Sequence, residues 1–394
     1  MLVSKSGLYT LAILLFPIAI TLKLDYYDEI VVSLLTLLFL FKPNKQIKKN
    51  DKIIFCLLIV SYLIGFLSNI ESKLIKRVDS VFIDAFVIYK PLLAFLTVRY
   101  LIDYDIHIQV IKKLQVWSKL FIIIGSVLAI VSQVVNIGMT MTEVRYGIKT
   151  FIFLYDTPTV FGVLTVMAII VLSYSNKTSI VYYVLGFVSL ILTTKGVFYS
   201  FLIFSIAIFL FNRRKKMKKR SFILLALLLA LGSIFQIETY FKDLTSPRMV
   251  FFSYSFKIAN DYYPLGSGFA TYGSEEAKQH YSELYKKYGF DAFWGMSEEE
   301  NQFLNDNYWA MIIGQLGYIG FILFIIIIYL IFNTANSHKY QNPKTRSLVI
   351  AALLMMYVTA IATGIVKSSM GICLFFFLGI VINNGRRVKI YIQK

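Results

Sequence analysis

Long apolar runs constrain this chain more than any other feature of its sequence. Many approach the roughly 20 residues that an α-helix needs to cross a bilayer. Only 16% of the residues are charged, whereas soluble domains carry about 25%. We therefore expect an all-α polytopic membrane protein with about 12 transmembrane helices. The predicted spans are 7–23, 28–42, 53–70, 81–102, 116–137, 158–174, 180–195, 197–212, 221–237, 308–332, 347–366 and 370–384.

The net charge of +18 is concentrated in short segments between these runs. Clusters of lysine and arginine lie at 42–52, 213–220 and 386–389. Such clusters stay on the cytoplasmic side of a membrane, so the pattern predicts topology rather than nucleic-acid binding. It predicts a multi-pass protein of the cytoplasmic membrane with both termini in the cytoplasm.

The segment 238–306 is different, because it holds 11 acidic and six basic residues. The topology places it outside, between nine transmembrane helices in 1–237 and three more, with a cytoplasmic tail, in 307–394. A loop this long is uncommon unless it is functional. Its helix caps predict three short helices. They begin at Ser246-Pro247, at Ser274 (ending at Gly289) and at Ser297-Glu298-Glu299-Glu300.

Signatures of soluble enzymes, such as a P-loop, G-x-S-x-G or H-E-x-x-H, do not occur in the sequence. Cys56 and Cys373 lie within apolar runs, and the three histidines are far apart. The sequence therefore predicts neither a metal site nor a cofactor. Any chemistry must depend on isolated polar residues at the outer membrane face.

Three cations are predicted at that face. Arg145 precedes the span that begins at Asp156-Thr157-Pro158, Lys195 lies in the turn before the eighth span, and Arg248 opens the external segment. A cation beside a helix N-terminus suits a phosphate, although such side chains also extend to lipid headgroups. Asp306 closes the external segment and is either a helix cap or a functional carboxylate.

Lys90-Pro91 lies in the middle of the fourth span. A lysine inside a membrane is a functional candidate, but it can equally pair with a carbonyl freed by Pro91 or with Asp84. His280, in the external segment, fits a solvated or packed histidine as well as a functional one.

Aromatic side chains are concentrated in the external segment. They can stack on sugar rings, or they can simply pack the short helices together. They are Tyr240, Tyr254, Tyr262, Tyr263, Tyr272, Tyr281, Tyr285, Tyr288 and Trp294.

The order of these motifs, over residues 80–335, resembles the O-antigen polymerase and ligase family. Ligases of that family often carry a histidine where this chain has Asp306, which favours the polymerase branch. The similar motifs are Arg145-Tyr146-Gly147 before Asp156-Thr157-Pro158, Thr194-Lys195-Gly196, Arg248 before Pro264-Leu265-Gly266-Ser267-Gly268, and Asp306-Asn307-Tyr308-Trp309 before Gln315-Leu316-Gly317-Tyr318-Ile319-Gly320.

The resemblance implies a fold similar to membrane-embedded (GT-C-like) glycosyltransferases, in a bacterial cytoplasmic (inner) membrane. Such an enzyme joins undecaprenyl-diphosphate-linked oligosaccharide repeats into O-antigen or capsular polysaccharide. Membrane lipid and a chain-length regulator protein are the implied partners, without metal or cofactor. The implied diphosphate-binding residues are Arg145, Arg248, Lys195 and Lys90. The implied catalytic residues are Asp306, with Glu300 and His280 as further candidates.

Two other functions are compatible with the sequence. A ligase of the same family would transfer finished polymer to lipid A core. A flippase for the lipid-linked repeat would use a cationic cavity, to which Lys90 and Arg99 in the fourth span would contribute. The lack of a two-fold repeat and the large external segment argue against a flippase.

Overall fold

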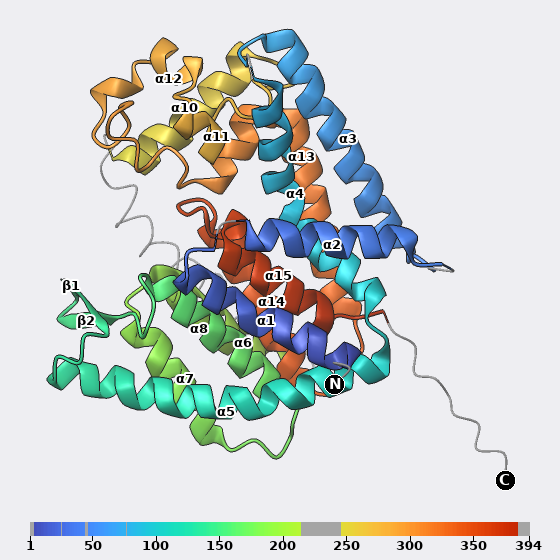
Figure 1. Ribbon diagram of the computed structural model, residues 1–394, viewed down its shortest axis with the longest axis vertical. Helices are drawn as coiled ribbons and strands as arrows, with labels where there is room; N and C mark the ends of the chain where they lie inside the picture. The colour runs from blue at the N-terminus through green and yellow to red at the C-terminus, as the bar shows by residue number, and fades with distance from the viewer. Residues whose placement is uncertain (1–3, 25, 44–45, 76, 214–245, 385–394) are drawn as a thin grey trace.

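The computed structural model describes residues 4–24, 26–43, 46–75, 77–213 and 246–384 (Figure 1). Helices cover all of the predicted spans except 221–237, which lies outside the described residues. The larger elements are α1 (Lys5–Thr21), α2 (Tyr27–Phe41), α3 (Lys49–Ser72), α4 (Val78–Leu101), α5 (Tyr104–Val134), β1 (Thr140–Arg145), β2 (Ile148–Phe151), α6 (Pro158–Leu172), α7 (Ile180–Leu192), α8 (Gly196–Arg213), α10 (Pro247–Asp261), α13 (Tyr308–Ser337), α14 (Pro343–Thr359) and α15 (Ser369–Val381).

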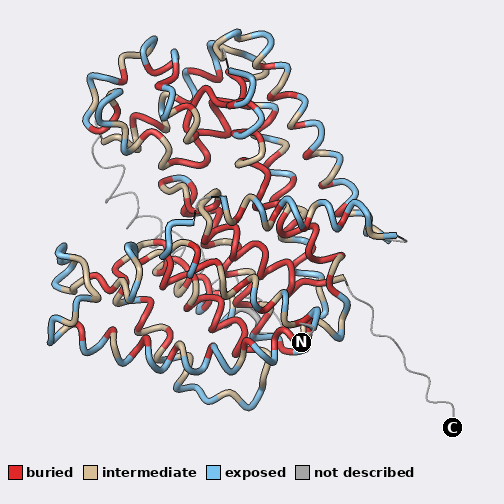
Figure 2. Tube along the Cα trace, viewed as in Figure 1, coloured by how far each residue is buried: buried red, intermediate tan, exposed pale blue. Residues whose placement is uncertain are grey.

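Four of the described helices, α3, α4, α5 and α13, are long and apolar enough to cross a membrane. Only 28% of the apolar stretch of α3 and 33% of that of α5 is buried, against 72% for α4. Figure 2 shows the buried residues gathered on the inner helices, with α3 and α5 largely exposed. Apolar surface of this extent is typical of contact with lipid. The chain therefore has the features of a helical membrane protein.

The predicted inner segments contact one another, and so do the predicted outer ones. On the inner side, the Nζ of Lys42 donates to the carbonyl of Tyr100 (2.6 Å), and Arg99 forms an ion pair with Asp51 (2.7 Å). On the outer side, the Nζ of Lys367 donates to the carbonyl of Gly273 (2.7 Å). These contacts join residues that were predicted on the same side, while the number of crossings and the location of each side stay predictions.

The span predicted at 347–366 differs from the helix that forms there. The amide cap Asn342 and Pro343 start α14 earlier than expected, and the helix ends at Thr359. A short connection that contains η2 (Ile365–Lys367) follows, and Ser368 caps α15. The connection lies at the outer end of the helices and lines the candidate site.

The hairpin of β1 and β2 after α5 was not predicted. Its turn is Tyr146-Gly147, where both residues adopt positive φ angles (55° and 76°), as the two-residue turns of tight hairpins require. The Oγ1 of Thr150 and that of Thr194 lie 2.5 Å apart. This hydrogen bond attaches the hairpin to the turn between α7 and α8.

The external segment forms short helices around an aromatic core of its own. α10 begins after Ser246, as predicted. The second predicted helix is divided into α11 (Glu275–Gln279) and α12 (Glu283–Lys287), because Tyr281 adopts a φ of 32° and Ser282 caps a new helix. The third is wrong: the Oγ of Ser297 accepts from the amide of Glu300 (2.9 Å), but the chain continues in turns.

Pro264–Gly268 joins the external segment to the helices below it. The amide of Gly268 donates to the carbonyl of Gln315 (2.8 Å), inside α13. α13 is kinked there, because Gly317 has a φ of 61° and a ψ of −167°. Gly266, with a φ of 86°, touches the backbone of Gly317, so neither position has room for a Cβ. The two glycine-containing motifs therefore meet as one backbone joint.

Candidate functional site

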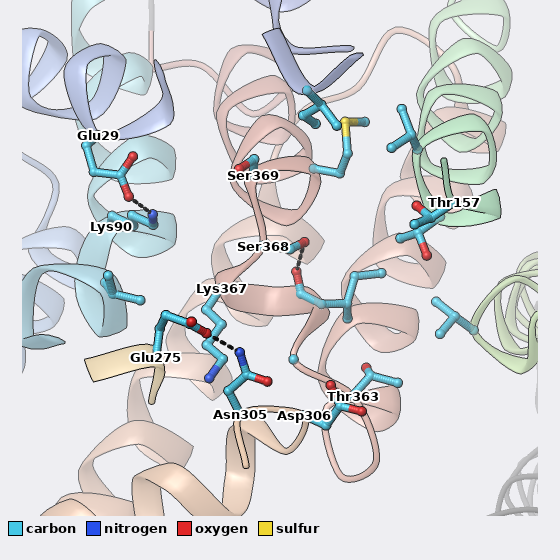
Figure 3. Close-up of a pocket in the computed structure, with 18 of the residues that line it drawn as sticks. Glu29, Lys90, Thr157, Glu275, Asn305, Asp306, Thr363, Lys367, Ser368 and Ser369 are labelled. Carbon is cyan, nitrogen blue, oxygen red and sulfur yellow. Dashed lines mark hydrogen bonds and ion pairs between the residues drawn. The ribbon is translucent and has the colours of Figure 1, made fainter. Parts of the chain in front are cut away.

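A cavity of about 740 Å³ lies between the external segment and the outer ends of the helices (Figure 3). It is lined by α4, by the first turns of α2, α6, α8, α10 and α15, by the end of α1, by the short helix 275–279 with residues 305–306 of the external segment, and by the connection from α14 to α15. Its lining is strongly charged. The acidic and basic side chains are Glu29, Asp84, Lys90, Lys195, Arg248, Glu275, Glu276, Asp306 and Lys367.

Arg248 and Asp306, 58 positions apart in the chain, meet in this cavity. The Nη2 of Arg248 lies 3.1 Å from the Oδ2 of Asp306, and both side chains are partly exposed. Arg248 is positioned by the first turn of α10. Asp306 precedes Asn307, whose side chain accepts from the amide of Ala310 (3.0 Å) and so caps α13. The structure thus assigns the capping role to Asn307 and leaves the Asp306 carboxylate at the cavity.

Lys195 lines the cavity from the turn before α8. Burial lowers the pKa of its amine, and the nearby cations Arg145 and Arg248 lower it further. The carboxylates Asp306 and Glu143 oppose this shift, so this end of the cavity holds charges of both signs.

Lys367 is a cavity residue that the sequence did not single out. Its amine donates to the carbonyl of Gly273 (2.7 Å), and it lies enclosed by the external segment. Burial lowers its pKa to about 8, although Asp84, Glu275 and Asp306 oppose the shift. The available signal was a single lysine between two apolar runs, which does not distinguish a site residue from a lipid-facing one.

The first turns of α6, α8 and α15 also border the cavity, through Thr157, Gly196 and Ser368. A helix N-terminus carries unpaired backbone amides and partial positive charge. Three such ends beside Lys195, Arg248 and Lys367 favour an anion, in the way that helix N-termini bind phosphate elsewhere.

Lys90 lies at the cavity wall but is held by two carboxylates. It forms ion pairs with Asp28 (2.6 Å) and with Glu29, both in the first turn of α2. It does not use Asp84, which instead accepts from the side-chain amide of Gln315 (2.8 Å). With two anions on one cation, this cluster adds no positive charge for a phosphate.

The remaining predicted residues do not line the cavity. Arg145 forms an ion pair with Glu143 on its own strand (2.7 Å). His280 is partly exposed and lies 3.8 Å from Glu276. Glu300 is exposed on the outer turns of the external segment. Of the predicted site residues, the cavity brings together Lys195, Arg248 and Asp306, with Lys90 at its edge.

No protein-family model, no curated protein and no solved structure matches the chain. The resemblance to the O-antigen polymerase and ligase family therefore stands on the motifs and their order. Each of the four groups of motifs contributes a lining residue to the same cavity, namely Thr157, Lys195, Arg248 and Asp306.

Proposed function

We propose that the protein is a polysaccharide polymerase that joins oligosaccharide repeats carried on a polyprenyl diphosphate, at the outer face of a bacterial cytoplasmic membrane. One observation carries the proposal: Lys195, Arg248 and Lys367, together with three helix N-termini, line a cavity that also presents carboxylates, Asp306 among them. The cavity lies where an external segment meets apolar helices. A substrate with a sugar, a diphosphate and a lipid tail matches these surroundings.

The cations serve the leaving group. As the bond from the anomeric carbon to the diphosphate oxygen breaks, negative charge develops on that oxygen. Arg248 is suited to a bidentate contact with a phosphate group, and Lys195 and Lys367 add positive charge to the same lining. The cations can neutralise the diphosphate, which then leaves with its lipid.

Asp306 is suited to the incoming sugar. The hydroxyl oxygen of the lipid-linked acceptor forms the new bond to the anomeric carbon, and its proton passes to a base. Asp306 is the cavity carboxylate that is paired with Arg248. The ion pair fixes the direction of the carboxylate, which a general base needs.

The flippase alternative drew its support from Lys90 and Arg99, two cations in the fourth span. Lys90 is paired with Asp28 and Glu29, and Arg99 with Asp51. These pairs account for both residues without a transported anion.

The experiment is deletion of the gene in its host, followed by gel analysis of the surface polysaccharide. Loss of the ladder above one repeat, restored by the wild-type gene, is the result we expect. Arg248→Ala should fail to restore it, whereas Arg77→Ala should succeed, since Arg77 is an exposed cation paired with Asp79. Finished polymer stranded on its lipid carrier would indicate a ligase instead. An unchanged ladder would refute the proposal.

A further inference from the structure

The structure separates the aromatic residues of the external segment into packed and exposed ones. Tyr272, Tyr281 and Tyr285 are buried in the core of the segment. The rings of Tyr254 and Tyr288 are covered by Lys257 (5.3 and 5.0 Å from the ring centroids). Packing therefore explains these residues.

Trp294 is different, because 68% of it is exposed. Its ring lies 5.0 Å from that of Phe303, at an angle of 52°. The amide of Phe303 donates to the carbonyl of Gly295 (3.2 Å), and the hydroxyl of Tyr281 donates to the carbonyl of Met296 (3.1 Å). The two rings are thus held in fixed positions at the surface.

This aromatic pair is directly connected to the cavity. The amide of Asp306 donates to the carbonyl of Phe303 (3.4 Å), so one turn links the ring to the candidate base. Three peptide units separate the two residues, which limits their Cα atoms to about 11 Å. A sugar chain that reaches Asp306 can therefore reach Phe303 and Trp294.

Polar groups surround the rings. The loop between them contains Glu298, Glu299, Glu300 and Asn301, and Gln302 lies beside Gly295. Carboxylates and amides accept hydrogen bonds from hydroxyl groups, while an aromatic face covers C–H groups. Two rings are far smaller than the surface that a stable protein partner covers, which is about 800 Å² on each side. The combination of two aromatic faces with surrounding hydrogen-bond acceptors therefore suits a carbohydrate rather than a protein partner.

We propose that Trp294 and Phe303 form a binding site for the glycan part of the substrate, outside the cavity that holds its diphosphate. The inference rests on the proposed function for the identity of the sugar. A chain held there would be positioned with one end at Asp306. The two rings thus act as positioning residues, and they extend contact with the polymer beyond the reacting unit.

Isothermal titration calorimetry of the purified full-length protein in detergent tests the site, because it measures affinity without Trp294 as the reporter. The probe is the single-repeat oligosaccharide released by mild acid from the lipid-linked intermediates of the host. Trp294→Ala should weaken binding about tenfold, and Trp294→Phe, which keeps a ring, should restore most of it. Tyr263→Ala is the matched control, because Tyr263 is a comparably exposed ring (70%) elsewhere on the external segment.

Phe303→Ala gives a second measurement, in which the change in Trp294 fluorescence on sugar binding should be lost. In the host, Trp294→Ala should shorten the polymer without abolishing it. Wild-type affinity and wild-type chain length in Trp294→Ala would overturn the inference, even if Arg248→Ala still removes the ladder. An unchanged ladder after gene deletion would instead refute the proposed function, on which the identity of the sugar depends.

Discussion

Replacing Lys367 by arginine should change how polymerisation depends on pH. Burial lowers the pKa of Lys367 to about 8. The amine is then about 90% charged at pH 7 and about 10% charged at pH 9. If its charge stabilises the departing diphosphate, kcat/KM should fall about tenfold for each pH unit above 8, because the charged form is lost as pH rises. Arginine keeps its charge throughout this range, so Lys367→Arg should remove that fall.

The assay measures initial rates on lipid-linked repeats extracted from the deletion strain, from about pH 6.5 to about pH 9.5. Low substrate concentrations are used, so that the rate reports kcat/KM and hence the free enzyme. Lys286→Arg is the control, because Lys286 is exposed on α12, outside the cavity lining. Lys367→Met should be slow at every pH. Full activity of Lys367→Met would refute the role, and so would an unchanged alkaline fall in Lys367→Arg.

Three further results are expected. Arg248→Ala should lower kcat by about 10²-fold to 10³-fold if Arg248 neutralises the leaving group, whereas a loss below threefold in purified protein would contradict this role. In a double-mutant cycle with Asp306→Asn, the two changes should be coupled by about 1 kcal/mol of transition-state free energy, and strict additivity would show that the observed ion pair is not used. Gly266→Ala should destabilise the folded protein by about 1–3 kcal/mol, because its Cβ would meet the backbone of Gly317; an unchanged melting temperature would contradict the packed joint.

The sequence predicted the helices well where composition determines them. Long apolar runs became α3, α4 and α13 close to the expected bounds. The hairpin of β1 and β2 was missed, because its signal is a short turn at Tyr146-Gly147 rather than a long periodic pattern. The predicted helix at Ser297 failed for a related reason. A cap can form a single turn, but only an apolar stripe on the following turns carries the helix further.

The candidate site was predicted in part, because sequence spacing does not reveal which charges meet. Lys90 had the position of a functional residue, yet its partners Asp28 and Glu29 come from another helix. Asp84, the partner considered from the sequence, bonds Gln315 instead. Lys367 showed no distinctive spacing at all. The ion pairs of Lys90 with residues of another helix therefore leave Lys367, rather than Lys90, available to the cavity.

The structure also gives the motifs of the family resemblance two different physical tasks. Gly266 and Gly317 join the external segment to α13 through a contact that leaves no room for side chains. Arg248 and Asp306 form an ion pair at the two ends of the same segment. The joint fixes the position of the segment, and that position brings the two charged ends together over the cavity. The glycine motifs therefore matter to the site without any contact with a substrate, so their substitution should reduce activity through geometry rather than through lost chemistry.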